Sequence, residues 1–358
     1  MVRIEAIEAR AYRIPTDAPE GDGTLRWDST TMVVVEVRAG GKTGLGWTYG
    51  SRAAATVVHE LAEIVVGRDA MEVGAVGRAM IARLRNAGPS GIGATAVSAV
   101  NVALWDLEAK LLDQPLASLL APMRDRIPVY GSGGFVTYTD EQLCTQLAGW
   151  IAEGITAVKM KVGAEPERDP ERMRKARSAI GPGATLMIDA NGAFDSSRAL
   201  AFAHAAVENG VAWFEEPVPQ SDRAGMRRVH EGAPAGMDIA AGEYLWAPAE
   251  ARDLVEAVDV LQADVTRCGG ITGFLEVAAI AEASRLPLSA HTAPTLHVGV
   301  ACAAPTMLHV EWFHDHVRVE QLLFDPTPDP HDGRLPLPEG PGHGLSLRRD
   351  AFDKYRVA

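Results

Sequence analysis

Ionisable residues recur at the ends of short β-type runs through the second half of the chain. Consecutive members of this series lie 20 to 28 residues apart: Lys161, Asp189, Glu215, Glu243, Asp264, His291 and Glu311. Each interval accommodates one strand, one helix and two loops. In a (β/α)₈ barrel the carboxyl ends of all the strands meet at one mouth, whereas an open doubly wound sheet would spread them along an edge. The series therefore favours the barrel.

The chain divides by pattern into three parts. An eighth β-type run, VYGSGG, precedes the series, so we expect an α/β protein with a modified TIM (β/α) barrel over residues 125–316. Residues 1–124 indicate an α+β capping domain with three strand patterns and three stretches of helical periodicity: 2–14, 31–39, 43–50, 52–66, 70–87 and 94–113. The Pro- and Gly-rich tail, 317–358, is too irregular for a barrel repeat. We expect it to return to the capping domain and complete it.

Charge and composition exclude several classes of protein. The chain carries 34 Lys and Arg against 47 Asp and Glu, a net charge of −13, which argues against a nucleic-acid partner. No apolar run reaches the roughly 18–20 residues of a membrane span. The N-terminus, MVRIEAIEARAYRIP, reads as a strand and not as a signal peptide. Cys144, Cys268 and Cys302 lie far apart in no metal-type spacing. We therefore expect a cytoplasmic protein without a membrane or nucleic-acid partner.

Three acids close three consecutive strand candidates. Asp189, Glu215 and Glu243 would lie on strands about 4.8 Å apart, so their carboxylates can reach a common point. Carboxylates at such a point repel one another unless they are protonated or bind a cation, and all-oxygen ligation suits Mg²⁺. The alternative is that each acid caps a helix or forms a surface salt bridge, which is less plausible for all three in phase.

Basic residues flank this acidic series on both sides. Lys159 and Lys161 share one face of a strand, so each is expected to lower the pKa of the other. A nearby metal ion would lower both pKa values further and provide a neutral amine base. A solvated Lys-x-Lys at a strand edge is the simpler alternative. Asp264 and His291 end the next two strands, and a carboxylate beside an imidazole fixes its tautomer and raises its basicity. A structural histidine is the alternative. Glu311 ends the eighth strand, either as a protonated hydrogen-bond donor or as a buried acid paired with a base.

Together these segments resemble the enolase superfamily, specifically its mandelate racemase branch (the mandelate racemase/muconate lactonizing enzyme family). The resemblance covers nearly the whole chain. It rests on seven motifs in family-like order and spacing: KMK, DANG, WFEEP, AAGE, DVTRCGGITG, SAH and HVE.

The resemblance implies a site and a chemistry. Enzymes of this superfamily use a Lys or His base with Mg²⁺ to remove the α-proton of a carboxylate and stabilise the resulting enediolate. On this pattern the residues that match the Mg²⁺ ligands are Asp189, Glu215 and Glu243. The matches to the catalytic groups are Lys161 on one face, the Asp264–His291 dyad on the other, and Lys159 and Glu311 at the substrate carboxylate. Further substrate contacts are expected from Asn191 and Trp27, and for Trp27 the alternative is a hydrophobic anchor that holds its loop. The family also implies a homo-oligomer.

One position separates the chain from neighbouring branches of the superfamily. Muconate-lactonizing enzymes and dipeptide epimerases place a catalytic lysine on the sixth strand in a Lys-x-Gly-Gly context, whereas this chain has Arg267 in TRCGG. Arginine stays protonated and is a poor base. The departure and the His291 dyad both favour the racemase branch over dipeptide epimerisation.

Two opposed acid/base groups permit two outcomes. Loss of a β-hydroxyl would dehydrate an acid sugar to a 2-keto-3-deoxy acid, the commoner activity within this branch and our first expectation. Reprotonation on the opposite face would make a racemase or epimerase of a 2-hydroxy acid. A barrel retained as a non-catalytic binding protein is the third alternative, and the complete set of candidate ligands and bases argues against it. The polar loop TDAPEGDGTLRWDS, 16–29, which carries Trp27, is expected to be mobile and to line the substrate pocket.

Overall fold

The computed structural model describes residues 1–357. Its centre is a closed barrel of eight parallel strands, in which the last strand pairs back onto the first. The strands are β4 (Arg126–Gly133), β5 (Ala157–Lys161), β6 (Thr185–Asp189), β7 (Val211–Glu215), β8 (Asp238–Ala241), β9 (Val260–Ala263), β10 (Leu288–Ala290) and β11 (Met307–Phe313). All eight predicted strands and the barrel are confirmed.

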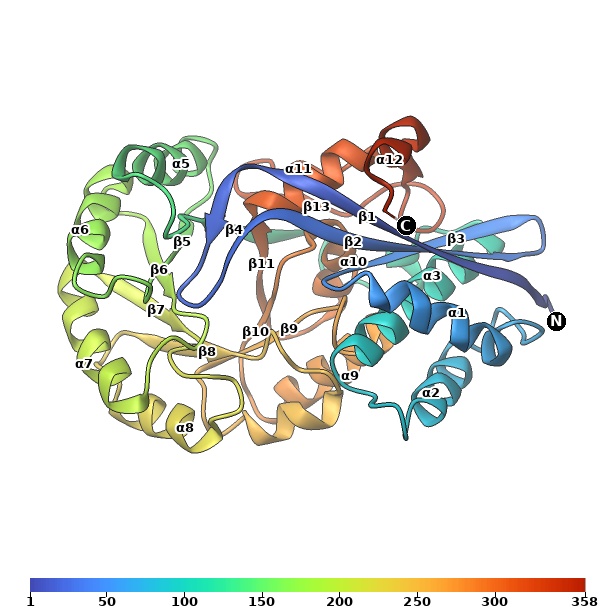
Figure 1. Ribbon diagram of the computed structural model, residues 1–358, viewed down its shortest axis with the longest axis horizontal. Helices are drawn as coiled ribbons and strands as arrows, with labels where there is room; N and C mark the ends of the chain where they lie inside the picture. The colour runs from blue at the N-terminus through green and yellow to red at the C-terminus, as the bar shows by residue number, and fades with distance from the viewer. Residues whose placement is uncertain (358) are drawn as a thin grey trace.

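Helices surround the barrel, as Figure 1 shows. They are α5 (Asp140–Ala152), α6 (Asp169–Ile180), α7 (Ser196–Ala206), α8 (Arg223–Gly232), α9 (Gly270–Ala283), α10 (Pro294–Ala303) and α11 (His314–Leu323), with a 3₁₀ turn η1 (Val207–Asn209) after α7. The barrel is modified after β8, where a 3₁₀ helix η2 (Pro248–Asp253) takes the place of an α-helix. This shorter connection accounts for the short interval between Glu243 and Asp264.

The capping domain begins with an antiparallel sheet of β1 (Ile4–Gly21), β2 (Arg26–Ala39) and β3 (Lys42–Tyr49). Its helices are α1 (Ala53–Val65), α2 (Val73–Arg83), α3 (Ile92–Leu111) and the short α4 (Leu116–Leu119). The predicted strands and helices of this region are confirmed. The β2–β3 turn uses Gly40 and Gly41 with φ of 55° and 71°, as a two-residue hairpin requires.

Helix α3 is buried between the cap sheet and barrel helix α9. Glycines in β3 allow the close approach, because a Cβ at Gly44 would lie 2.1 Å from the backbone oxygen of Ala103. Asp106 of α3 is fully buried and accepts hydrogen bonds from the backbone N–H groups of Leu45 (2.6 Å) and His343 (2.7 Å). One carboxylate thus joins α3 to the cap sheet and to the C-terminal tail.

The tail contacts both barrel and cap. Its strand β13 (Arg334–Pro336) pairs with β4, and the short strands β12 (Phe324–Asp325) and β14 (Ser346–Leu347) pair with each other. Helix α12 (Arg349–Tyr355) returns to the cap sheet, where the rings of Phe352 and Tyr12 meet edge to face at 4.6 Å. The division into 1–124, 125–316 and 317–358 stays a prediction.

The segment 16–29 differs from the expected mobile loop. It continues β1 and β2 as a long hairpin that crosses the barrel (Figure 1), with Glu20 paired to Trp27 and only residues 22–25 forming the turn. The turn residue Gly23 packs on the mouth, because a Cβ there would lie 2.4 Å from the backbone oxygen of Ala190. Local turn-forming residues indicated a loop, but strand pairing and this distant contact order the segment.

Glu20 anchors the hairpin from a buried position. Its Oε2 accepts a hydrogen bond from Trp27 Nε1 (2.8 Å), its Oε1 has no hydrogen-bond partner, and the residue is fully buried. Burial and the nearby Asp315 carboxylate raise the pKa of Glu20 to about 9. Near neutral pH this side chain is therefore held as the protonated acid.

We predict that Glu20→Gln stabilises the protein more at pH 8 than at pH 5. The contribution of Glu20 to the free energy of unfolding is fully present below its ordinary pKa near 4.5 and falls as pH rises toward 9, whereas glutamine cannot titrate. The gain of the variant over wild type should grow by about 2 to 4 kcal/mol between the two pH values. Urea unfolding measures it, with exposed Glu5→Gln on the same strand as control. An equal gain at both pH values would contradict the prediction.

Candidate active site

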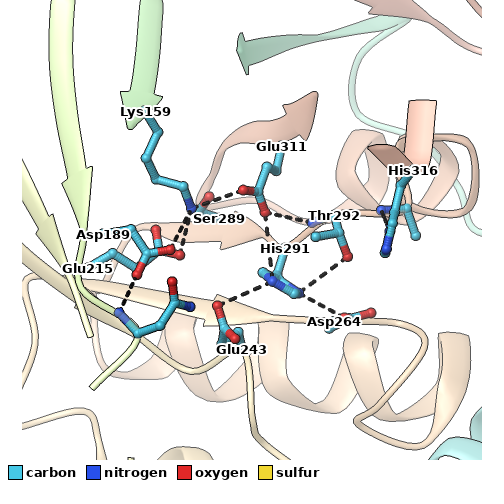
Figure 2. A network of polar contacts seen from close by, with 12 residues as sticks. Lys159, Asp189, Glu215, Glu243, Asp264, Ser289, His291, Thr292, Glu311 and His316 are labelled. Atoms are coloured by element: carbon cyan, nitrogen blue, oxygen red, sulfur yellow. Dashed lines mark hydrogen bonds and ion pairs between the residues drawn. The ribbon is translucent and has the colours of Figure 1, made fainter. Parts of the chain in front are cut away.

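Three carboxylates meet at the carboxyl ends of neighbouring strands. Asp189 ends β6, Glu215 ends β7 and is paired with Asp189 in register, and Glu243 lies two residues beyond β8. One oxygen from each lies within 4.8 Å of the others, and the three residues are 0 to 1% exposed (Figure 2). The structure thus brings together the acids that the sequence predicts to be metal ligands.

Both lysines of β5 reach this acidic cluster. Lys159 Nζ lies 2.6 Å from Glu215 Oε1 and 2.9 Å from Glu311 Oε1, and Lys161 Nζ lies 2.5 Å from Asp189 Oδ2. Their shared strand face, which period-two alternation predicts, is therefore directed into the barrel mouth. The solvated alternative for Lys159 and Lys161 is excluded, since they are 0% and 5% exposed.

The carboxylates around Lys159 and Lys161 act against the expected lowering of the two lysine pKa values. Burial does lower the pKa of both amines, but the carboxylates outweigh burial and mutual repulsion, so that both pKa values lie above the ordinary range. Glu215 has the largest raising effect on Lys159, and Asp189 on Lys161. The expectation weighed the neighbouring lysine and a nearby metal ion, whereas the contacts of both amines add acids that neutralise the pair.

His291 and Asp264 form the predicted dyad. His291 Nδ1 lies 2.9 Å from Asp264 Oδ2, and Nε2 lies 3.2 Å from Glu243 Oε2. Burial lowers the pKa of His291, but Glu243 and the bond to Asp264 outweigh this effect and raise it to about 9. The imidazole is thus oriented by Asp264, with its other nitrogen directed at the carboxylate cluster (Figure 2).

Glu311 of β11 is an ionised carboxylate in this arrangement. Its Oε1 pairs with Lys159, and its Oε2 accepts the backbone N–H of Thr292 at 2.8 Å. Burial raises the pKa of Glu311, but Lys159 and His291 outweigh it and lower the pKa to about 2. Of the two interpretations from sequence, these contacts favour the buried acid paired with a base over the protonated donor.

Arg267 and His291 alternate with two carboxylates, those of Asp264 and Glu243, in a closed ring of oppositely charged side chains. Arg267 Nη1 donates to the backbone oxygen of Glu243 (3.1 Å), its Nε lies 3.4 Å from Asp264 Oδ2, and its guanidinium stacks 4.6 Å from the centre of the Tyr244 ring. Arg267 Nη1 also lies 3.4 Å from Glu243 Oε1, and His291 contacts the carboxylates of the same two residues, Glu243 and Asp264. The guanidinium therefore holds together the loops that follow β8 and β9.

Sequence reasoning missed the layer below the carboxylates. Trp213 Nε1 donates to Glu215 Oε2 (3.1 Å), and the Tyr130 hydroxyl lies 3.4 Å from Lys159 Nζ. Trp213 precedes Glu215 by two residues, and residues two apart in a strand lie on the same face. This alternation could have predicted the contact from sequence. Glu216, also missed, is buried with φ of 37°, and its Oε1 has no hydrogen-bond partner.

The two other predicted contacts lie at the rim of the mouth. Trp27 is half-buried and meets the ring of Phe135 edge to face at 5.7 Å; Phe135 in turn meets Phe313, which lies 6.0 Å from Lys161 Nζ. Asn191 has φ of 45°, and its Oδ1 is buried without a hydrogen-bond partner. Trp27 thus belongs to an aromatic wall on the Lys161 side, while Asn191 presents a free acceptor.

The residues fit a hard divalent cation. Near the cluster, six buried carboxyl groups accompany three basic side chains: Asp189, Glu215, Glu216, Glu243, Asp264 and Glu311 against Lys159, Lys161 and Arg267. Burial raises the pKa of Glu215, the Lys159 ammonium lowers it and the Asp189 carboxylate raises it, with a net value of about 8. This excess of acid over base, with carboxylate oxygens within ligating distance of one another, is typical of an oxygen-ligated metal site.

Barrel, cap and site together define the class of protein. The N-terminal domain model of the mandelate racemase / muconate lactonizing enzyme family matches residues 20–121, and the enolase C-terminal domain-like model matches residues 142–351. The chain therefore belongs to the mandelate racemase/muconate lactonizing enzyme family of the enolase superfamily, as its motifs predict.

Similar structures span the whole chain. A mandelate racemase/muconate lactonizing enzyme-like protein from Rubrobacter xylanophilus is 52% identical, with a TM-score of 0.97 over 99% of this chain and 100% of its own. A racemase from Streptomyces coelicolor with bound magnesium is 31% identical, with a TM-score of 0.93 over the same shares.

Among curated relatives, the D-galactarolactone cycloisomerase of Agrobacterium fabrum is 29% identical over 99% of both chains. The L-talarate/galactarate dehydratase of Salmonella typhimurium is 30% identical over 98% of this chain and 90% of its own. Similar proteins thus catalyse both loss of water and isomerisation.

Proposed function

We propose that the protein is a Mg²⁺-dependent enzyme that removes the α-proton of a carboxylate substrate, and that it dehydrates an acid sugar to a 2-keto-3-deoxy acid. The observation that carries this proposal is the position of two different basic groups around one carboxylate cluster: Lys161 reaches it from β5, and His291 from the end of β10. Relatives named as dehydratases and a racemase with bound magnesium support it.

Asp189, Glu215 and Glu243 would hold Mg²⁺. The ion supplies Lewis-acid stabilisation of the negative charge that develops on the substrate carboxylate when the α-carbon loses its proton. Lys159 adds a fixed positive charge beside Glu215 and Glu311, where the same charge develops. Because the α-proton of a carboxylate is very weakly acidic, this concentration of positive charge is what the chemistry demands.

Lys161 and His291 would exchange protons with the substrate. One takes the α-proton as general base; the other donates a proton to the departing β-hydroxyl, so that water leaves and an enol remains. The enol then takes a proton at C3 and becomes the 2-keto-3-deoxy acid. Asp264 keeps His291 Nδ1 in place, which leaves Nε2 for the proton transfer. Asn191 Oδ1 and Trp27 would contact the remainder of the substrate.

A racemase or epimerase of a 2-hydroxy acid is the second candidate. The same two groups on separate strands would take the α-proton on one face and return it on the other. The similarity to a racemase supports this alternative. The similarity to a cycloisomerase adds a related reaction, an isomerisation that leaves the mass of the substrate unchanged.

Mass spectrometry distinguishes these functions. A library of acid sugars and 2-hydroxy acids is incubated with enzyme and Mg²⁺ in D₂O and then returned to H₂O. A dehydratase gives a product that lacks one water and carries one carbon-bound deuterium at C3. A racemase gives α-deuteration without loss of water, and a cycloisomerase gives a new retention time. No change in any compound, with the chain folded and Mg²⁺ bound, would contradict the proposed chemistry.

We infer a homo-oligomer in the cytoplasm that acts on a small carboxylate without a nucleic-acid or membrane partner. Among residues 1–357 no helix is long and apolar enough to cross a bilayer, and the three cysteines are free thiols. Light scattering after size-exclusion chromatography measures the oligomeric state.

A further inference from the structure

The turn that carries His291 has an unusual backbone. Thr292 and Ala293, which follow His291 directly, have φ of 50° and 38°. Left-handed backbone is rare for residues other than glycine, and a β-branched threonine is especially disfavoured there. Such a conformation persists only when surrounding contacts hold it.

Two side chains from β11 and α11 hold consecutive N–H groups of the turn. Glu311 Oε2 accepts the N–H of Thr292 at 2.8 Å, and His316 Nδ1 accepts the N–H of Ala293 at 3.3 Å. His316 is 8% exposed, and Figure 2 shows it on the far side of Thr292 from the carboxylates. Burial and the charge of His291 lower the pKa of His316 to about 3, which keeps Nδ1 free to accept.

The capping domain fixes the His316 ring. Tyr49, the last residue of β3, stacks on it with ring centres 3.5 Å apart and planes 17° from parallel. The Tyr49 hydroxyl lies 3.2 Å from Glu320 Oε1, and Glu320 Oε2 accepts the Thr295 hydroxyl at 2.6 Å. The rings of Phe313 and His316 meet edge to face, with centres 5.1 Å apart. The imidazole is therefore held between the cap and the barrel.

We propose that His316 is a positioning residue that aims His291, and that Tyr49 is the contact through which the capping domain sets this geometry. His316 acts through the strained turn and does not exchange protons with the substrate. The proposal rests on the proposed function, in which His291 is an acid/base group. It gives the cap a second task beside covering the mouth: alignment of one of the two catalytic groups.

Two nearly isosteric variants separate positioning from ligand binding. Asparagine at position 316 can place its amide oxygen near the site of Nδ1 and accept the Ala293 N–H, whereas glutamine places its amide near the site of Nε2. The first measurement is amide hydrogen exchange of the holoenzyme with Mg²⁺. For His316→Gln we expect exchange at residues 292–293 to rise about tenfold or more, and for His316→Asn to stay within about threefold of wild type.

Turnover of the acid that the D₂O screen identifies is the second measurement. A catalytic group displaced by about 1 Å costs roughly 100-fold, so His316→Gln should lose about that much in kcat with little change in KM, while His316→Asn retains a third or more. Tyr49→Ala should resemble His316→Gln, and Tyr49→Phe, which keeps the stack, should resemble His316→Asn. Thermal melts confirm that each variant is folded.

The outcomes distinguish this proposal from the proposed function. If the glutamine variant is active and the asparagine variant is not, His316 acts through Nε2 on a ligand and the positioning role is overturned. Equal hydrogen exchange in both variants also overturns it. If the wild type acts on no acid, the proposed function fails, while the exchange data still show whether His316 holds the turn.

Discussion

Glu215→Gln should abolish Mg²⁺-dependent turnover and leave the fold intact. Replacement of a charged ligand oxygen by an amide weakens a site that rests on three carboxylates, so we expect kcat/KM to fall by roughly 1,000-fold or more. The amide oxygen can still accept the Trp213 N–H, and the loss of the Lys159 ion pair is offset by reduced repulsion from Asp189. The melting temperature of the metal-free protein should therefore change by only a few degrees.

Metal binding provides a readout that does not depend on a substrate. A ligand that binds only the folded state raises the melting temperature as its concentration exceeds Kd. Mg²⁺ should raise the melting temperature of wild type and of the control Glu282→Gln, an exposed position on α9, and leave that of Glu215→Gln unchanged. A Glu215→Gln variant that binds Mg²⁺ and turns over like wild type would disprove the ligand assignment.

The barrel and its polar mouth could be predicted from sequence because both follow from local periodicity. Each strand of the barrel is a short apolar run followed by a helix, and in the strands after β4 an ionisable residue lies at or near the carboxyl end. Asp189 and Glu215 illustrate the point, since their register pairing places them side by side without any knowledge of loops. The seven motifs from KMK to HVE, which follow one another in family-like order and spacing, identify the family.

The rest of the site depends on contacts that no local pattern contains. His316 belongs to a helix start after the last barrel strand and meets Tyr49, which is 267 positions earlier in the chain. Turn-forming residues dominate the segment that carries Trp27, so the sequence predicts a loop there. In the structure the segment is instead a hairpin, because β1 and β2 pair across the barrel mouth. In each case the deciding partner comes from a distant element.

The lysine pair shows the same limit for electrostatics. Lys159 and Lys161 alone would repel, and sequence alone could not weigh Glu215, Glu311 and Asp189 around them. These acids outweigh the repulsion between the two amines and raise the pKa of both. A bound divalent cation competes for the same carboxylates, so the protonation of Lys161 and the occupancy of the metal site are linked.

Lys161→Met and His291→Asn should each reduce turnover by roughly 1,000-fold or more, and they should differ in α-proton exchange. In a dehydratase one group removes the α-proton and the other protonates the leaving hydroxyl. The variant that lacks the acid should still exchange the α-hydrogen of the substrate with D₂O, because the base and the charge stabilisation by Lys159 remain. The variant that lacks the base should exchange nothing. Deuterium incorporation into recovered substrate, followed by NMR, therefore identifies which face loses the proton.

The same pair of variants tests the racemase alternative. A two-base racemase would keep exchange of one enantiomer in Lys161→Met and of the opposite enantiomer in His291→Asn, with racemisation lost in both. Lys354→Met and His204→Asn, exposed positions on α12 and α7, control for the substitutions themselves. Wild-type turnover in either Lys161→Met or His291→Asn would remove that residue from the mechanism. Because Lys161 and His291 reach the carboxylates from separate strands, loss of one leaves the other in place, and the two exchange patterns can be read independently.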